Sequence, residues 1–463
     1  MLIRFIIKNF RSFNEETEVL LTPSRAMHLR NHVIPGKRSR DPHILKSALL
    51  YGANASGKSN FTKALHLIKK MVVDSTVQNR IDYEPFRLAA GQSDKLSKLE
   101  VEFRIGDNNY AFGIDFNRKQ IVNEWLYSID KESDSILYER KTNTKGQVTV
   151  SFGNLKLSKD ENARLHFMGL DTRPTETFLR AVNARNTSNI KGLAQFHEAY
   201  KWFNESLVII FPDSKYQGLE SSIHSNAELK DIYQLFLQRF DTGIAGLDTK
   251  KVDFFSSEVN LPKELKENIN QDMEDGDSAI VTSFDNIRYS ISKDRKGKIN
   301  AVKLLTQHRV KGKNNMVNFE VNQESDGTQR IMDFIPAMVD IINQDCVFVI
   351  DEIDRSLHPK LVHKLFEMFY NNSEGIRSQL LATTHEDHLL DKQLLRSDET
   401  WLVEKNKEGE TLIKSLAEYK VRSDLDIRKG YINGRFGAIP NLMDIDVTDF
   451  TTKRNAEWSR VNA

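Results

Sequence analysis

The residues best placed to do chemistry lie in one loop, GANASGKSN, from Gly52 to Asn60. The loop fits the pattern G-x-x-x-x-G-K-[ST] at every fixed position, with an apolar strand before it and helical spacing after it. Gly52 and Gly57 let the backbone turn its N–H groups toward phosphate oxygens, while Lys58 neutralises the outer phosphates. The Ser59 hydroxyl suits Mg²⁺. We therefore predict a nucleoside triphosphate site with contacts from Gly52, Asn54, Ala55, Ser56, Gly57, Lys58, Ser59 and Asn60.

A pair of acids ends a second apolar run. The stretch DCVFVIDEID contains the continuous run Val347–Ile350, as a buried parallel strand should, followed by Asp351 and Glu352. In phosphate-loop enzymes an Asp at this place holds Mg²⁺, and an adjacent Glu can polarise the attacking water. We predict that Asp351 joins Ser59 as a metal ligand and that Glu352 is catalytic. The alternative is a strand that ends in solvated acids, which the phosphate loop in the same chain makes less attractive.

A second anion site is predicted at the start of another helix. The stretch ESDGTQR precedes IMDFIPAMVDII, whose apolar residues recur at helical spacing, so Ser325 and Gly327 lie at the helix N-terminus. A hydroxyl and free N–H groups at such a place favour anions. One nucleotide is not expected to contact both Lys58 and this helix start in the same subunit. We therefore expect two subunits to pack head to tail, with the nucleotide between Lys58 of one and Ser325 of the other.

These residues need a framework of several lobes, because 463 residues exceed one ordinary core. Residues 1–150 are strand-rich, and 101–116 alternates around a Gly-Asp-Asn-Asn turn as a hairpin does. Residues 151–285 show mostly helical spacing, as in 227–240, and residues 286–463 return to alternating strands and helices. We predict an N-terminal half with the phosphate loop and a β lobe, a mostly helical insertion, and a C-terminal half with the acidic strand end.

Composition narrows the class of protein. The chain is 39% hydrophobic and 28% charged with a net charge of +1, so contact with nucleic acid would need a local basic patch. Residues 291–313 offer one, with eight Lys or Arg against one Asp, whereas the acidic residues 264–277 are expected to form a solvated loop. The one cysteine, Cys346, suits a reducing compartment, and no apolar run approaches a membrane span. We expect a cytoplasmic protein with no membrane contact.

Four further stretches resemble the ABC-type ATPase heads of SMC, RecF and OLD-like proteins. The resemblance implies an α/β fold, an ABC-type P-loop ATPase head with a mixed N-terminal β lobe, a parallel-sheet core and a helical insertion lobe. It also implies ATP and Mg²⁺ as the ligands and hydrolysis to ADP and phosphate. The stretches are the opening strand IKNFRSF, residues 7–13, the signature loop ESDGTQR, residues 324–330, the D-loop IDRSLHP, residues 353–359, and the strand with its switch histidine, LLATTHEDHLLD, residues 380–391.

The resemblance also implies roles for single residues. Ser325 and Gly327 would contact the γ-phosphate bound by the opposite subunit, and Asp354 would lie at the dimer seam. His385 would hydrogen-bond the γ-phosphate or the attacking water. A strand-end histidine on its own is more often structural, but its position after the acidic pair favours the switch role. Arg11 would lie at the nucleotide edge.

Some positions depart from that pattern. Asp326 stands where the signature has its first glycine and Thr328 where it has glutamine, and an acid near a γ-phosphate is unfavourable unless it points away. Gln78 and Gln92 are the candidates for the glutamine of the Q-loop. The stretch HEDH, residues 385–388, lacks zinc-site spacing and two ligands do not close a site, so we expect no metal besides Mg²⁺.

Other stretches resemble the stand-alone ATPases of bacterial abortive-infection and anti-phage operons, such as the Septu, PARIS and retron-associated systems. They include YEPFRL at 83–88, FLRAVNARN at 178–186 and YINGRFGAIP at 431–440. This resemblance implies a homo-oligomer built from head-to-tail dimers, a separately encoded nuclease or toxin effector, and a phage-derived trigger. Two alternatives stay open. One is a RecF-like DNA-repair ATPase that clamps duplex DNA through 291–313, and the other is a nucleotide-gated binder that does not hydrolyse, against which Glu352 argues.

Overall fold

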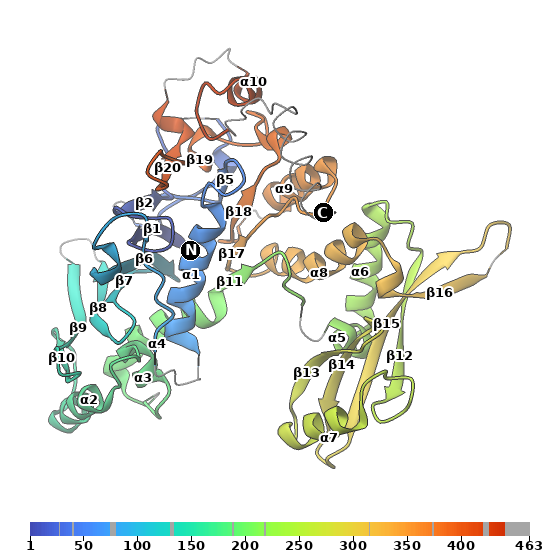
Figure 1. The fold of residues 1–463 in the computed structure, drawn as a ribbon, viewed down its shortest axis with the longest axis horizontal. Helices are drawn as coiled ribbons and strands as arrows, with labels where there is room; N and C mark the ends of the chain where they lie inside the picture. Colours follow the sequence, from blue (N-terminus) through green and yellow to red (C-terminus); the bar gives the residue numbers. More distant parts are fainter. Residues whose placement is uncertain are drawn as a thin grey trace, which may run out of the picture.

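The computed structural model describes all but a few segments of the chain, and the gaps are short except at the C-terminus. Its described residues form a seven-stranded, a six-stranded and a five-stranded sheet, together with a two-stranded one. Figure 1 shows the first two sheets next to each other and the five-stranded sheet in a lobe of its own. The described residues are 1–26, 28–38, 41–74, 80–129, 134–187, 189–216, 219–313, 315–372, 375–419 and 426–439.

The six-stranded core sheet has the order β11-β17-β18-β5-β19-β20. Its first five strands run parallel and β20 pairs antiparallel with β19. Because parallel strands end at the same edge, the segments that follow β5, β17 and β18 meet there. The strands are β5 (Ser47–Tyr51), β11 (Leu207–Ile210), β17 (Val347–Ile350), β18 (Gln379–Thr384), β19 (Thr400–Lys405) and β20 (Thr411–Ser415).

Helices cover both faces of the core sheet, which explains why its strands are apolar without alternation. Leu50 and Val349 pack on one face in a cluster with Leu65 of α1 (Lys58–Val73). Leu49 and Ile350 pack on the other face. That second face is covered by α8 (Asp326–Ile341) and α9 (Pro359–Asn372), with α10 (Ile427–Ile432) contributing at its rim.

The seven-stranded sheet is antiparallel, in the order β10-β9-β8-β7-β6-β1-β2, and forms the N-terminal β lobe. The hairpin predicted for 101–116 is confirmed as β6 and β7. Three helices, α2 (Lys159–Asp171), α3 (Phe178–Asn183) and α4 (Ala194–Lys201), share its hydrophobic cluster. The strands are β1 (Leu2–Lys8), β2 (Thr17–Leu20), β6 (Ser97–Ile105), β7 (Asn108–Phe116), β8 (Ile121–Ile129), β9 (Asp134–Thr142) and β10 (Val148–Phe152), while β3 (Val33–Ile34) and β4 (Ile44–Leu45) pair apart from it.

One buried amide joins the antiparallel lobe to the core sheet. The Gln379 side chain, at the start of β18, accepts a hydrogen bond from the Leu2 N–H at 2.5 Å. It donates to the carbonyls of Leu2 and Leu45, both at 2.9 Å. The first strand of the chain is thereby fixed to a core strand more than 370 residues away.

The five-stranded sheet belongs to a third part, which we call the distal lobe and define as residues 219–320. Its order is β12-β15-β14-β13, and β16 pairs with the far end of β15. Figure 1 shows the β15–β16 hairpin extending from this lobe. Its elements are α5 (Leu219–Ser225), α6 (Ala227–Arg239), β12 (Gly246–Asp253), α7 (Lys263–Asp272), β13 (Ser278–Thr282), β14 (Arg288–Lys293), β15 (Ile299–Arg309) and β16 (Met316–Glu320).

The α/β class with a parallel core and an N-terminal β lobe is confirmed, but the expected helical insertion at 151–285 needs correction. Its first helices pack on the antiparallel lobe, β11 completes the core sheet, and only the rest enters the distal lobe. The boundary expected at 286 cuts the β13–β14 hairpin. Residues 264–277 were expected as a loop, yet α7 covers 263–272. These helices form because the sheets bury one side of each. No helix among the described residues is long and apolar enough to cross a membrane.

Candidate nucleotide site

The phosphate loop connects β5 to α1, and its backbone conformation depends on glycine. Gly57 has φ of 111°, and a Cβ at this position would collide with the Thr411 hydroxyl of β20. The Ser56 N–H donates to the Ala53 carbonyl at 3.2 Å and tightens the loop, while Asn54 and Ala55 at its tip are exposed. The loop therefore has the shape of a phosphate cradle at a helix N-terminus. Within the described residues the buried Ser56 hydroxyl has no hydrogen-bond partner.

Lys58 lies across its own loop. Its ammonium donates to the carbonyls of Gly52 and Ala53 at 2.7 and 3.0 Å and lies 3.3 Å from Nδ1 of His385. Burial lowers the pKa of Lys58 to about 8, although the nearby acids Asp354, Asp351 and Glu352 act in the opposite direction. A bound phosphate would offer this ammonium a stronger partner than two neutral carbonyls.

One threonine holds both acids of the predicted catalytic pair. The Thr383 hydroxyl, on β18, donates to Asp351 Oδ1 at 2.6 Å and accepts from the Glu352 N–H at 2.8 Å. Asp351 is 3% exposed, whereas the Glu352 side chain is 36% exposed. Glu352 also has φ of 51°, a left-handed conformation that non-glycine residues adopt rarely and often at functional sites. The buried acid suits a metal ligand, and the exposed one can reach water.

The loop after β18 adds the predicted switch histidine. Nδ1 of His385 is 3.1 Å from the Gly52 carbonyl, and the backbone N–H of His385 donates to Asp354 Oδ2 at 3.2 Å. The other Asp354 oxygen is buried and has no partner among the described residues. The sheet edge thus brings together Lys58, Asp351, Glu352, Asp354 and His385, whose roles remain predictions. Ser59 and Asn60 follow in the first turn of α1.

The predicted signature residues belong to a separate group. Ser325 caps α8, and its hydroxyl accepts from the Thr328 N–H at 3.2 Å. A Cβ on Gly327 would lie 2.6 Å from the Ser356 carbonyl, so the signature packs on the D-loop of its own chain. Among the described residues, no hydrogen bond joins Ser325 or Gly327 to the phosphate loop. Asp326, the departure from the family pattern, borders a cavity of the distal lobe.

Arg11 lies beside the phosphate loop but is engaged elsewhere. Its guanidinium donates to Glu84 at 2.7 Å. The next residue, Ser12, accepts hydrogen bonds from the side chains of Asn60 and Thr411, each at 2.7 Å. The Arg11 loop is therefore tied to the start of α1. A cavity of about 360 Å³ runs along this helix and is lined by Arg11, Phe10, Lys63, His66, Glu84 and Phe211.

Several contacts of the site could not be predicted from the sequence. Thr383 carries a weak signal, two positions before the switch histidine in ATTHED. Ser12 and Thr411 meet the phosphate loop only in the fold, since 399 residues separate them. Of the two candidates for the Q-loop glutamine, Gln92 is 5% exposed and donates to Asn14 in the antiparallel lobe, so it is a structural residue there. Gln78 lies outside the described residues.

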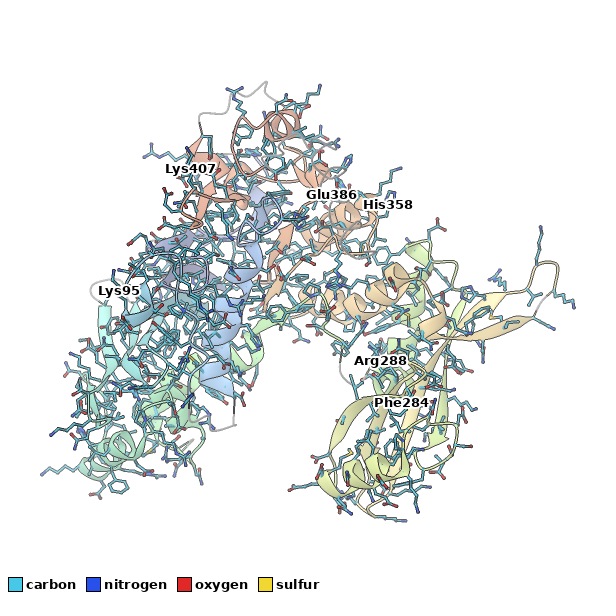
Figure 2. All side chains as sticks on the ribbon, viewed as in Figure 1. Lys95, Phe284, Arg288, His358, Glu386 and Lys407 are labelled. Carbon is cyan, nitrogen blue, oxygen red and sulfur yellow. The ribbon has the colours of Figure 1, made fainter. Side chains whose placement is uncertain are left out.

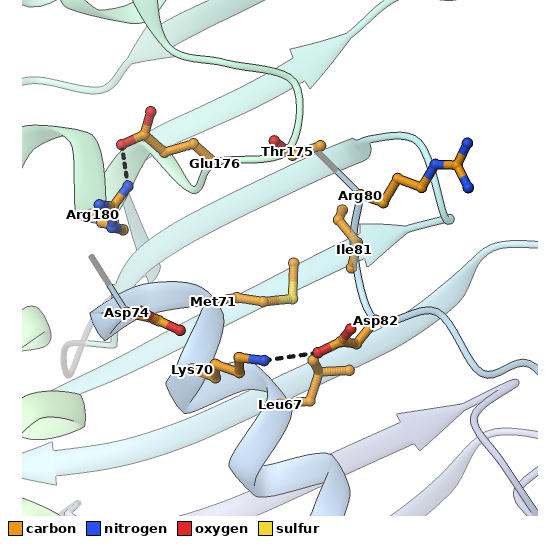
Figure 3. Close-up of a pocket in the computed structure, with 10 residues that line it drawn as sticks. All are labelled: Leu67, Lys70, Met71, Asp74, Arg80, Ile81, Asp82, Thr175, Glu176 and Arg180. Carbon is orange, nitrogen blue, oxygen red and sulfur yellow. Dashed lines mark hydrogen bonds and ion pairs between the residues drawn. The ribbon is translucent and has the colours of Figure 1, made fainter. Parts of the chain in front are cut away.

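Two other groups of polar side chains lie near these elements. A hollow of about 50 Å³ lies by the last turns of α1. Figure 3 shows the ion pairs Lys70–Asp82 and Glu176–Arg180 among the residues that line it. The hollow is too small for a nucleotide.

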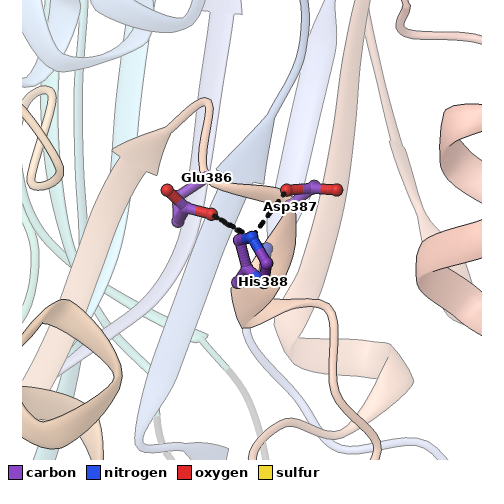
Figure 4. A group of neighbouring side chains, drawn as sticks. All are labelled: Glu386, Asp387 and His388. Atoms are coloured by element: carbon purple, nitrogen blue, oxygen red, sulfur yellow. Dashed lines mark hydrogen bonds and ion pairs between the residues drawn. The ribbon is translucent and has the colours of Figure 1, made fainter. Parts of the chain in front are cut away.

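Figure 4 shows Glu386, Asp387 and His388. The side-chain atoms by which these residues could hold a metal ion all lie within 4.8 Å of one another. Arg428 of α10 already contacts two of them, donating to Asp387 at 2.8 Å and lying 2.9 Å from His388 Nε2. This cluster holds α10 against the segment that follows His385.

Comparisons with known proteins place these features in context. A family model described as "AAA domain, putative AbiEii toxin, Type IV TA system" matches residues 47–391. No curated protein matches.

Similar solved structures include an SMC head domain from Thermotoga maritima, at 12% identity and a TM-score of 0.35 over 89% of this chain and 98% of that one. An SmcHead bound to the C-winged helix domain of ScpA is 13% identical, with a TM-score of 0.37 over 90% of this chain and 99% of that one. An Smc head with an extended coiled coil, bound to the C-terminal domain of ScpA derived from Pyrococcus furiosus, is 12% identical. Its TM-score is 0.33 over 90% of this chain and 97% of that one.

Proposed function

The chain belongs to the AAA-domain family that this model describes and has an ABC-type P-loop head fold, and from this premise we propose that it hydrolyses ATP to ADP and phosphate. The observation that carries the proposal is the meeting of Lys58, the Asp351–Glu352 pair and His385 at one edge of the core sheet. Each follows a different parallel strand, and the Thr383 hydroxyl fixes the two acids relative to each other.

The residues present fit a magnesium nucleotide. Ser59, at the start of α1, and the buried Asp351 would hold Mg²⁺, which would neutralise charge on the outer phosphates. Lys58 would leave the Gly52 and Ala53 carbonyls for a phosphate and so lose its contact with His385. Glu352, half-exposed and held through its N–H, would accept a proton from the attacking water. His385 would then be free to hydrogen-bond the γ-phosphate.

We infer further that two copies act head to tail. Among the described residues Ser325 and Gly327 offer a helix N-terminus with no hydrogen bond to their own phosphate loop, so the second copy would supply them to the nucleotide. Asp354 would then lie near the seam. ATP would hold the two heads together, and hydrolysis would release them.

The biological role that we propose is an ATP-dependent sensor and scaffold of an anti-phage complex, which controls a separately encoded nuclease or toxin effector. The description of the family as a toxin of a Type IV TA system supports a defence role. Lys58→Ala should abolish ATP turnover and phage protection together. Lys364→Ala, on the exposed surface of α9, is the matched control and should change neither. Full protection by a Lys58 variant proven not to bind ATP would contradict the proposal.

The alternative of a DNA clamp depends on the basic stretch 291–313, which the fold divides. Arg295, Lys296 and Lys298 lie at one end of β15, and Arg309, Lys311 and Lys313 lie at the other. The strand between these ends spans roughly 35 Å at about 3.3 Å per residue. Lys303, between them, is buried and paired with Glu258 and Glu320 at 3.0 and 2.7 Å.

A filter-binding titration with duplex DNA and ATP tests this alternative. A clamp that uses these cations would lose affinity steeply as salt rises. Absence of salt-sensitive binding would exclude it. The third reading, a binder without turnover, would be supported if the purified protein released no phosphate even with its effector and trigger present.

A further inference from the structure

Strand β16 is an exposed edge with apolar side chains. It pairs with β15 and with no other described strand. Met316 and Val317 are each 47% exposed, and Phe319 is 38% exposed. An outer edge carries unpaired backbone N–H and C=O groups, which other edge strands can bind. This edge is therefore able to pair with a further strand and to cover its apolar side chains in doing so.

The charges around β16 have opposite signs at its two ends. The tip of the β15–β16 hairpin carries Arg309, Lys311 and Lys313, with no acid in the interval 306–319. The base carries the acids Glu320, Glu324 and Asp326, which lead into α8. Glu320 is paired with Lys303 and Glu324 lies 2.7 Å from His308, whereas Asp326 is exposed and is the acid that faces a partner. An antiparallel partner with the same sequence would place its basic tip beside this acidic base, and its acidic base beside this basic tip.

We propose that β16 pairs antiparallel with β16 of a second copy, about a two-fold axis at Asn318. This register uses all five residues of the strand. It places Val317 of each copy opposite Phe319 of the other, so the pair occurs two times in the interface. These apolar side chains share one face of the sheet, where the His308 ring packs on Phe319 at a centroid distance of 5.0 Å. The interface is isologous, and its two charged ends attract.

This interface is separate from the nucleotide and is the means by which ATP-held dimers join into a larger homo-oligomer. Only that last role rests on the proposed function, since the strand pairing needs no ATP. The base of the hairpin is firmly connected to the signature helix. Glu324, next to Ser325, accepts from the Thr306 hydroxyl at 2.5 Å and lies 2.7 Å from His308 Nε2. The paired strands would therefore hold the two signature loops at a fixed spacing.

Cysteine cross-linking tests the register directly, because the single native cysteine, Cys346, is buried. In full-length Asn318→Cys, the two new thiols would lie directly opposite each other, about 5 Å apart at Cα, which suits a disulfide. In Met316→Cys, on the same strand and face, they would be four residues apart, or about 13 Å. With oxidised glutathione and no nucleotide, we expect a covalent dimer from Asn318→Cys and little from Met316→Cys. Equal cross-linking of both variants, or of neither, would overturn the proposal.

Sedimentation without nucleotide supplies a second test. Phe319→Glu should raise the dissociation constant of the β16 dimer by roughly tenfold or more, because it puts a charge at the apolar centre. Phe284→Glu is the matched control, since Phe284 is 73% exposed in the same lobe but lies outside β16, and it should leave the constant unchanged (Figure 2). Equal association of both variants would contradict the inference. A failure of ATP-dependent dimerisation would instead count against the proposed function and leave these two measurements intact.

Discussion

The two predicted anion sites, one at the edge of the core sheet and one at the start of α8 beside the distal lobe, are held in place by different interactions. In the core, β5, β17 and β18 are buried on both faces by apolar clusters, so the loops that follow them have little freedom. The distal lobe meets α8 partly through a charged network around Arg288, which Figure 2 labels. The predicted catalytic residues thus follow strands that are packed on both faces, whereas the signature helix lies next to a charged network, which we call the polar joint.

That joint consists of side chains from several elements. Arg288 of β14 is paired with Glu220 of α5 and donates to Asp333 of α8 at 2.8 Å, and Lys215 reaches the same Asp333 at 3.1 Å. They border a cavity of about 350 Å³. Burial raises the pKa of Glu220, and one of its oxygens has no partner among the described residues. Helix α8 also packs on the distal lobe through an apolar cluster in which Ile331 and Ile335 meet Leu237 and Leu304, so the charged network lies beside a packed contact.

The largest effect should come from the core. Glu352→Gln should lower the rate of ATP hydrolysis by about 10²–10⁴-fold, because it removes the base while the amide keeps the size of the side chain. ATP affinity should be retained, and the dimer should persist. Phosphate release and nucleotide binding measure the two effects. Glu386→Gln, in the cluster after His385, is the control and should hydrolyse ATP normally. A Glu352→Gln enzyme with wild-type turnover would remove Glu352 from the mechanism.

The distal joint should give the next largest effect, on stability. Arg288→Met should lower the free energy of unfolding of this lobe by about 3 kcal/mol, since it leaves Glu220 and Asp333 buried without their shared cation. Arg355→Met is the control, because it removes an ion pair in which the arginine is half-exposed. It should change the free energy of unfolding by less than about 1 kcal/mol. Hydrogen exchange would locate the loss. Protection lost equally in the core sheet would show that the two parts do not unfold separately.

A smaller effect concerns pH. Without nucleotide the pKa of Lys58 is about 8, and bound phosphates should raise it because they favour the ammonium. The complex then binds more protons than the free protein above that pH. ATP affinity should be constant below about pH 8 and fall by up to about tenfold per unit above it. Calorimetry from pH 7 to 9.5 would measure this, with Lys58→Arg expected to flatten the profile. A flat wild-type profile would contradict the lowered pKa.

The smallest effect tests the bridge between the two acids. Thr383→Val keeps the shape of the side chain but removes two hydrogen bonds, so turnover should fall by about fivefold. The KM for ATP should change little, because Thr383 would not touch the nucleotide. Thr384→Val, one residue further along β18, is the control. A fall as large as that of Glu352→Gln would mean that Thr383 itself acts on substrate.

Prediction from sequence succeeded where the signal was local. The phosphate loop and the apolar run before Asp351 have fixed spacing, so β5, α1 and β17 could be predicted within a residue or two. In the distal lobe the helical spacing at 227–240 is confirmed as α6, but the strands and α7 carried a weaker signal. Strand β12 reads GLDTKKVD, with charges that the fold exposes, and α7 has only two apolar side chains, Leu265 and Ile269. Both depend on neighbours far along the chain, as do the contacts of Thr411 and Ser12 with the phosphate loop.

The Gln379 amide has a mechanical consequence. Its three hydrogen bonds attach the first strand and Leu45 to the beginning of β18, and the same strand delivers His385 at its other end. A tilt of the antiparallel lobe must either break these three hydrogen bonds or shift β18 along its axis. A displacement of the antiparallel lobe would then be transmitted along β18 to His385, which contacts Lys58 of the phosphate loop.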